Sequence, residues 1–213
     1  MSSEFGYIPE SPEQSFGNNK GILTPTDIYD LTRADKYTQY GQLELIETKT
    51  ISSSSSAIFT SIDESKYNVH FLTINNYQPT TDSKRVRIRF FESGVEETAS
   101  VYQVATQQGL ADGTFTEVKS TGQDHLRSVT STGNSTSPPE SGNGYIYFYN
   151  LGDSSKYSFV TMQTSAQNAV PRFIMEFGSG VLPQASTVDQ IKLYVNAGTF
   201  SATASLYGIK EYS

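Results

Sequence analysis

The sequence predicts an all-β chain: an antiparallel β-sandwich or jelly roll with an extended N-terminal arm and one short helix. Three observations predict this fold class. The chain has 14 Tyr and 12 Phe beside no Trp, no Cys and three Met, a composition that favours strands and turns. Short stretches of alternating apolar and polar residues recur, separated by turn residues. No long amphipathic helix pattern interleaves with them, which argues against a doubly wound α/β fold.

Residues 1–41 form the expected arm and short helix. Pro and Gly interrupt residues 1–23, yet this stretch carries four spaced apolar side chains: Phe5, Tyr7, Ile8 and Phe16. Each would gain roughly 1.5–3 kcal/mol if it filled a pocket on a neighbouring subunit. We therefore expect the arm to contact another chain on assembly, with a disordered terminus as the alternative.

A short helix is expected to begin at Pro25. Thr24 suits the N-cap, Pro25 suits the first helical position, and Asp27 meets the positive end of the helix. Ile28 and Leu31, three residues apart, would form its apolar stripe. A further helical turn is expected near residues 61–66.

Residues 42–213 form the expected β-sandwich domain. From Gln42 onward Leu43 and Leu45 alternate with Glu44, and Ile46 shifts the pattern, which indicates a β-bulge. The polar segments 52–56 and 130–142 are expected to be exposed loops, with a presented binding loop as the alternative for the second. The other predicted strands are residues 68–74, 84–91, 99–105, 144–150, 157–163, 172–177, 190–195 and 202–209.

The charge pattern argues against a nucleic-acid partner. The formal net charge is −7, whereas binding to a phosphate backbone normally needs a clustered basic surface. One basic cluster exists, formed by Lys84, Arg85, Arg87 and Arg89. It alternates with apolar residues and so indicates the solvent face of a strand.

The N-terminus lacks the basic and apolar regions of a signal peptide. No stretch approaches the ~18 apolar residues of a membrane span. We therefore expect a protein that is made in the cytoplasm, does not insert into a membrane, and stays soluble or joins an assembly.

The sequence offers little for catalysis, so we expect a chain that is not an enzyme and needs no metal or cofactor. Its two histidines, His70 and His125, lack metal-ligand spacing. His70 lies in a predicted strand and His125 in a predicted loop. The acidic pairs 63–64 and 96–97 lie in short polar stretches and give a glycosidase little support.

The most distinctive stretch is residues 144–150. Alternation puts Tyr145, Tyr147 and Tyr149 on one face of a strand, and Ile146 and Phe148 on the other. Because both faces are apolar, we expect the strand to be central and the tyrosines to pack within the sandwich or at a subunit interface. The alternative is a platform that stacks glycans.

Several segments resemble virion structural proteins of tailed phages of marine cyanobacteria and their relatives. The matching segments are residues 19–31, 40–46, 145–151, 177–183 and 206–210. The resemblance implies a particle appendage or capsid decoration protein that is located in the virion and contacts other phage structural proteins. It also implies a homo-oligomer, with a trimer as the expected stoichiometry.

These inferences lead to one expected function and one alternative. We expect a non-enzymatic bacteriophage structural protein, such as a capsid decoration, head or neck fibre, or tail appendage subunit, anchored by its arm. The alternative is a carbohydrate-binding module that recognises host surface glycans through Tyr145, Tyr147 and Tyr149.

Overall fold

A computed structural model describes residues 14–15, 18–19, 24–34, 42–135, 139–168 and 172–211. The chain divides into two units, Met1–Gln42 and Leu43–Ser213, and each is described by itself. The four arm residues Phe5, Tyr7, Ile8 and Phe16 lie outside the described residues.

The first unit contains a capped helix. Strands β1 (Gln14–Ser15) and β2 (Asn18–Asn19) pair antiparallel, and helix α1 spans Pro25–Arg33. The Thr24 hydroxyl accepts a hydrogen bond from the Asp27 N–H at 3.2 Å, and the Asp27 carboxylate accepts one from the Thr24 N–H at 2.8 Å. This capping box confirms the predicted start of the helix.

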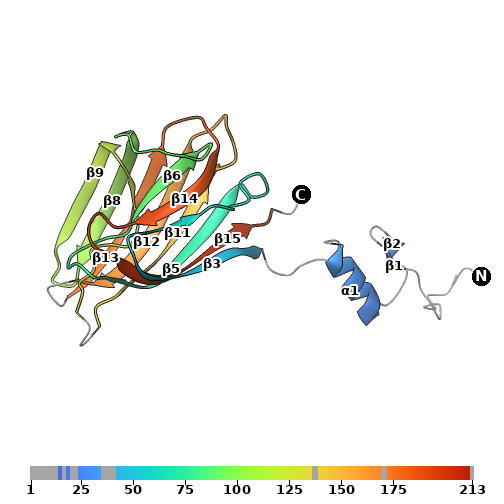
Figure 1. Cartoon of the computed structure of the whole chain (residues 1–213), viewed down its shortest axis with the longest axis horizontal. Helices are drawn as coiled ribbons and strands as arrows, with labels where there is room; N and C mark the ends of the chain where they lie inside the picture. Colours follow the sequence, from blue (N-terminus) through green and yellow to red (C-terminus); the bar gives the residue numbers. More distant parts are fainter. Residues whose placement is uncertain are drawn as a thin grey trace, which may run out of the picture. The chain divides into compact units, whose positions relative to one another are not determined.

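The second unit is a β-sandwich of two antiparallel sheets (Figure 1), which confirms the predicted fold class. The eight strands of the large sheet are, in spatial order, β3 (Leu43–Ser54), β15 (Phe200–Ile209), β5 (Val69–Pro79), β11 (Gly142–Tyr149), β12 (Ser158–Gln167), β13 (Phe173–Leu182), β8 (Tyr102–Leu110) and β9 (Phe115–Gln123). The small sheet has the order β10 (Leu126–Arg127), β6 (Arg87–Glu92), β14 (Val188–Tyr194) and β4 (Ser56–Phe59), and β7 (Val95–Glu96) pairs with β6.

The core lies between the two sheets because alternate residues of their strands point inward. On the large sheet, Ile146 and Phe148 are fully buried, and on the small sheet Ile88 and Phe90 are fully buried. The rings of Phe90 and Phe148 meet edge to face with centroids 6.0 Å apart. The apolar alternation seen in the sequence therefore marks the inner faces correctly.

Strands β3 and β15 pair with an irregular step in the large sheet. Leu206 pairs with Glu47 and Tyr207 pairs with Leu45, so Ile46 has no partner opposite it and forms the predicted bulge. Packing explains why residue 208 is a glycine, because a Cβ at this position would lie 2.3 Å from the ring of Tyr67.

Three local predictions are wrong. Residues 61–66 form a hydrogen-bonded turn, in which Asp63 has a φ of 53°, and not a helix. Most of segment 52–56 belongs to β3 and β4, because its backbone pairs with neighbouring strands. Within segment 130–142, Thr130 and Thr132 are fully buried and the Thr130 N–H donates to the Thr164 hydroxyl at 3.3 Å.

Candidate functional site

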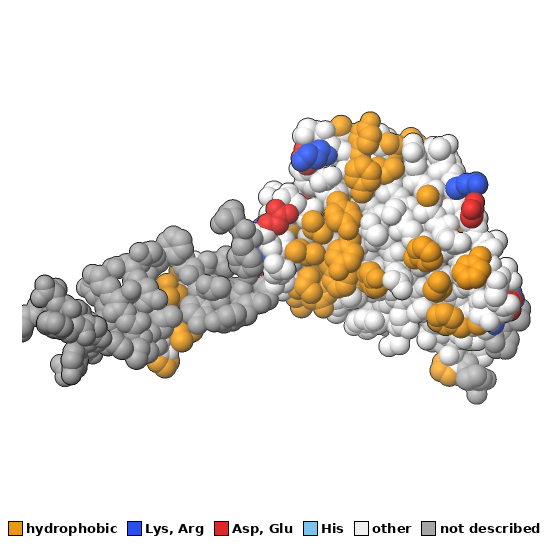
Figure 2. All heavy atoms as spheres, turned by 180° about the vertical axis from the view of Figure 1, so that it is seen from behind, with side chains coloured by type: hydrophobic (Ala, Val, Ile, Leu, Met, Phe, Trp, Pro, Cys, Tyr) orange, Lys and Arg blue, Asp and Glu red, His pale blue; other side chains and the backbone are white. Residues whose placement is uncertain are grey.

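The outer face of the large sheet, which points away from the core, is almost free of charge. We define this outer face by the outward side chains of six adjacent strands: β15, β5, β11, β12, β13 and β8. Within these described strands, Glu176 is the one Lys, Arg, Asp or Glu residue, and it points inward and is fully buried. In Figure 2, hydrophobic side chains spread over a broad face whose charged side chains lie at its margins.

Five aromatic side chains form a contiguous aromatic cluster on the outer face. The Phe71 ring lies 4.8 Å from Tyr147 and 6.1 Å from both Tyr145 and Tyr207, measured between centroids. Tyr147 also contacts Tyr145 at 6.0 Å and Tyr149 at 6.4 Å. Strand pairing explains the cluster, because Tyr207, Phe71 and Tyr147 are direct neighbours across β15, β5 and β11.

The tyrosine row predicted from the sequence is therefore real, but its environment differs from the prediction. Strand β11 is central, between β5 and β12, and Ile146 and Phe148 point into the core. Of the two placements expected for the tyrosines, packing within the sandwich is wrong, and packing at a subunit interface stays a prediction. Tyr145 is 39% exposed and the rings of Tyr147 and Tyr149 are half-buried against their neighbours, because the small sheet covers the opposite face of β11.

A groove with a volume of about 390 Å³ lies beside Tyr145 on the outer face, and we call it the amide groove. Aromatic and sulfur-containing side chains form its apolar surfaces, and carboxamides and hydroxyls form the rest. Its main lining residues are Phe71, Tyr145, Asn143, Gln163, Ser165, Phe173 and Met175.

Two carboxamides of this groove are held in fixed orientations. The Gln163 Oε1 atom accepts a hydrogen bond from the Tyr145 hydroxyl at 2.8 Å. The Asn143 Oδ1 atom accepts one from the Asn76 N–H at 2.9 Å. Asn76 has a φ of 53° and lies where the pairing of β5 with β11 shifts register. Both amide nitrogens are consequently the groups left to donate to a ligand.

A second groove, of about 620 Å³, lies farther along the same face, over β12, β13, β8 and β9. Phe159, Val181 and Ala105 line it together with Gln103 and the edge residue Lys119. Both grooves therefore belong to the outer face, which makes this face the candidate functional site.

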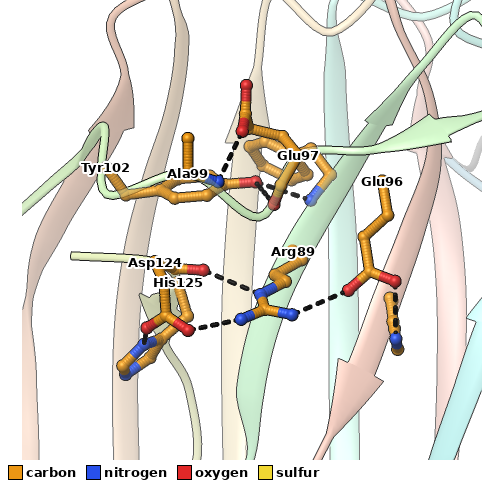
Figure 3. Close-up of polar contacts among 9 residues, drawn as sticks. Arg89, Glu96, Glu97, Ala99, Tyr102, Asp124 and His125 are labelled. Atoms are coloured by element: carbon orange, nitrogen blue, oxygen red, sulfur yellow. Dashed lines mark hydrogen bonds and ion pairs between the residues drawn. The ribbon is translucent and has the colours of Figure 1, made fainter.

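The outer side of the small sheet carries a different arrangement, a network of ion pairs around Arg89 (Figure 3). The Arg89 guanidinium bonds Glu96 at 3.0 Å and the Asp124 carboxylate, and its Nε donates to the Asp124 carbonyl at 2.8 Å. Lys192 bonds the second oxygen of Glu96 at 2.7 Å. Burial alone would raise the pKa values of Asp124 and Glu96, but the bonds from their cationic and histidine partners lower both. Of the predicted basic cluster, Arg89 and Arg85 are thus paired with acidic side chains.

The two histidines occupy separate structural positions. His70 is fully buried, and its Nε2 lies 2.7 Å from the Ile62 carbonyl oxygen. His125 follows β9 in a loop, and its Nδ1 lies 2.6 Å from the Asp124 carboxylate. Burial lowers the pKa of both imidazoles. Among the described residues, no group of three or more His, Cys, Asp or Glu side chains is placed to hold a metal ion.

A buried ionic cluster around Glu176 was missed by sequence reasoning. Arg85 approaches the Glu176 carboxylate at 3.2 Å, Arg127 bonds both of its oxygens, and Thr106 and Gln108 donate at 2.8 and 2.6 Å. The one signal in the sequence is an acidic residue in the middle of an apolar strand, which predicts a buried partner.

Searches of protein-family descriptions, curated protein sequences and solved structures found no match to this chain. Within the described part of the chain, no helix has the length and apolar character required to cross a bilayer.

Proposed function

We propose that this chain is a non-enzymatic structural subunit of a bacteriophage particle, and that its β-sandwich joins other copies through the aromatic cluster. The observation that carries the proposal is the outer face of the large sheet, where six adjacent strands present aromatic rings and no charge.

The composition of this face supports a protein contact. Charged residues are depleted and Tyr and Phe are enriched in the centres of protein interfaces. A tyrosine ring buries apolar area while its hydroxyl keeps a hydrogen bond, so Tyr145, Tyr147 and Tyr149 suit a surface that is exposed before assembly and covered after it. Leu43 and Leu45, both exposed on the neighbouring strand β3, extend the apolar surface beside Tyr207.

The size of the face also supports an interface. Six strands spaced about 4.8 Å apart, each with about four outward residues at ~6.6 Å intervals, span roughly 600–800 Å². A stable protein interface buries about 800 Å² on each partner. The outer face is therefore close to the area that one such contact needs.

The placement in a phage particle and the trimeric stoichiometry rest on the sequence resemblance. In this proposal the arm side chains Phe5, Tyr7, Ile8 and Phe16 anchor the subunit to another virion protein. The sandwich then contacts further copies of itself, and closed symmetry would cover the aromatic cluster.

Light scattering of two variants tests the self-association. Tyr147→Glu places a charge at the centre of the aromatic cluster and is expected to convert the oligomer to a folded monomer. Val95→Glu is the matched control, because Val95 is 70% exposed on β7 of the small sheet, and it should remain oligomeric. A wild-type chain that is monomeric at high concentration contradicts the self-association.

A cryo-electron microscopy map of purified particles tests the virion assignment separately. We expect density for the β-sandwich at a regular position with an arm that reaches a neighbouring protein. Particles that assemble fully and lack this chain would contradict the structural role.

A further inference from the structure

We propose that the amide groove binds a neutral oligosaccharide. This function goes beyond the assembly role and requires that the groove stay open when copies join. The groove reaches from β5 across β11 and β12 to β13, and it shares Phe71 and Tyr145 with the aromatic cluster, which extends from there toward β15.

The groove combines exposed ring surfaces with apolar flanks. Tyr145 is 39% exposed and Phe173 is 49% exposed, and both line the groove together with Met175. Sugar rings have apolar C–H faces that pack against such aromatic surfaces. A volume of about 390 Å³ lies within the range of roughly 300–1,000 Å³ of small-ligand sites.

The polar groups of the groove match hydroxyl groups. Gln163 and Asn143 hold their carboxamide oxygens against the Tyr145 hydroxyl and the Asn76 N–H, so each presents its NH₂ group as a donor. The hydroxyl of Ser165, which faces Asn143 across the strand pair, can donate or accept. Small-ligand sites usually combine apolar and aromatic surfaces with a few placed polar groups. The donors of this groove can pair with the hydroxyl groups of an uncharged ligand.

The uncharged lining of the groove disfavours anionic ligands. The lining residues, all within the described part of the chain, include no Lys or Arg and no Asp or Glu. A phosphate, sulfate or carboxylate group would find no counter-ion there, and a nucleic acid would lack the contacts that give it affinity. A neutral glycan needs none of these.

The local backbone supports a built site. Asn76 adopts a positive φ of 53° at a register shift between β5 and β11, and its N–H fixes the Asn143 side chain. Strained residues and bulges recur beside binding sites, where they aim a side chain that regular pairing would misplace. Asn143 is the side chain aimed here.

The experiment uses the whole chain on an array that holds neutral, sulfated and carboxylated glycans. We expect binding to a subset of the neutral glycans. Gln163→Glu replaces the donor NH₂ with an oxygen and keeps an acceptor for the Tyr145 hydroxyl, so it should weaken binding about tenfold or more. Gln107→Glu adds the same charge at another exposed position of the outer face, on β8 and outside the groove, and should bind like the wild type.

Three outcomes would overturn the proposal: no binding to any neutral glycan, binding to anionic glycans alone, or unchanged binding in Gln163→Glu. A fourth would reassign the groove. If Gln163→Glu dissociates an oligomer that Gln107→Glu leaves intact, the groove is an interface between copies and not a glycan site. Loss of glycan binding with the oligomer intact leaves the proposed assembly role unaffected.

Discussion

The two sheets of the sandwich present opposite kinds of outer surface. On the small sheet, Arg89 and Lys192 lie outward and are joined to Glu96 and Asp124, so their charges are satisfied within the domain. On the large sheet, the outward side chains of six strands are aromatic, aliphatic or neutral polar. The charged side chains on the outer side of the small sheet therefore already have partners within the domain. The outer face of the large sheet exposes apolar area, and burying that area against a partner is favourable.

The largest expected effect separates the two faces of β11. Phe148→Ala removes a fully buried ring and is expected to lower the free energy of unfolding by about 3–5 kcal/mol. Tyr145→Ala removes an exposed ring on the same strand and should cost less than about 1 kcal/mol. Urea unfolding of the two variants, measured under conditions where both are monomeric, compares them directly. Similar costs would show that the outer row stabilises the domain itself.

A second prediction concerns Glu176, the one acidic residue of the six strands that define the outer face. Glu176→Gln leaves Arg85 and Arg127 without their buried counter-ion and should cost roughly 3 kcal/mol of unfolding free energy. Glu117→Gln is the matched control, because Glu117 pairs with Lys119 on the exposed edge strand β9, where an ion pair contributes about 0–1 kcal/mol. Chemical denaturation of both variants checks the difference, and equal stabilities would contradict the importance of burial.

The smallest expected effect is a dependence of stability on pH. Burial lowers the pKa of His70 and of His125, so between these lowered values and about 6.5 the unfolded chain binds more protons than the folded one. Stability should therefore fall as the pH falls from 7 toward 5. Urea unfolding at pH 7, 6 and 5 measures the slope, and His70→Gln should reduce it. A wild-type stability that is constant over this range would refute the prediction.

Sequence reasoning was most accurate where one face of a strand is buried. The alternation that includes Ile88 and Phe90 located β6, although this strand begins at Arg87 and not at residue 84 as predicted, and the shift at Ile46 located a bulge. Sequence reasoning did not predict strand β9. The side chains of β9 are mostly exposed, and backbone pairing to β8 holds this strand in place. An edge strand without a buried face leaves no period-two apolar pattern to detect.

The candidate site could be predicted only in part, for two physical reasons. A sheet face that binds a partner carries the same apolar pattern as one that packs inside its own domain, so the row at Tyr147 did not reveal which case applies. The predicted strand 68–74 stopped before Asn75 and Asn76, yet both residues lie inside β5 at an irregular step. The ion pairs of Glu176 join residues 49 and 91 positions apart, which no local pattern displays.

The order of strands in the large sheet also constrains when the domain can fold. Within the second unit, the last strand in sequence, β15, lies between the first strand, β3, and the third strand, β5. Until Phe200–Ile209 has been synthesised, β3 and β5 each lack a neighbour, and their edges are open to pairing with other chains. Contacts this distant in sequence also slow folding. Folding is therefore expected after synthesis of the whole domain, and protease resistance that appears in nascent chains lacking β15 would contradict this order of events.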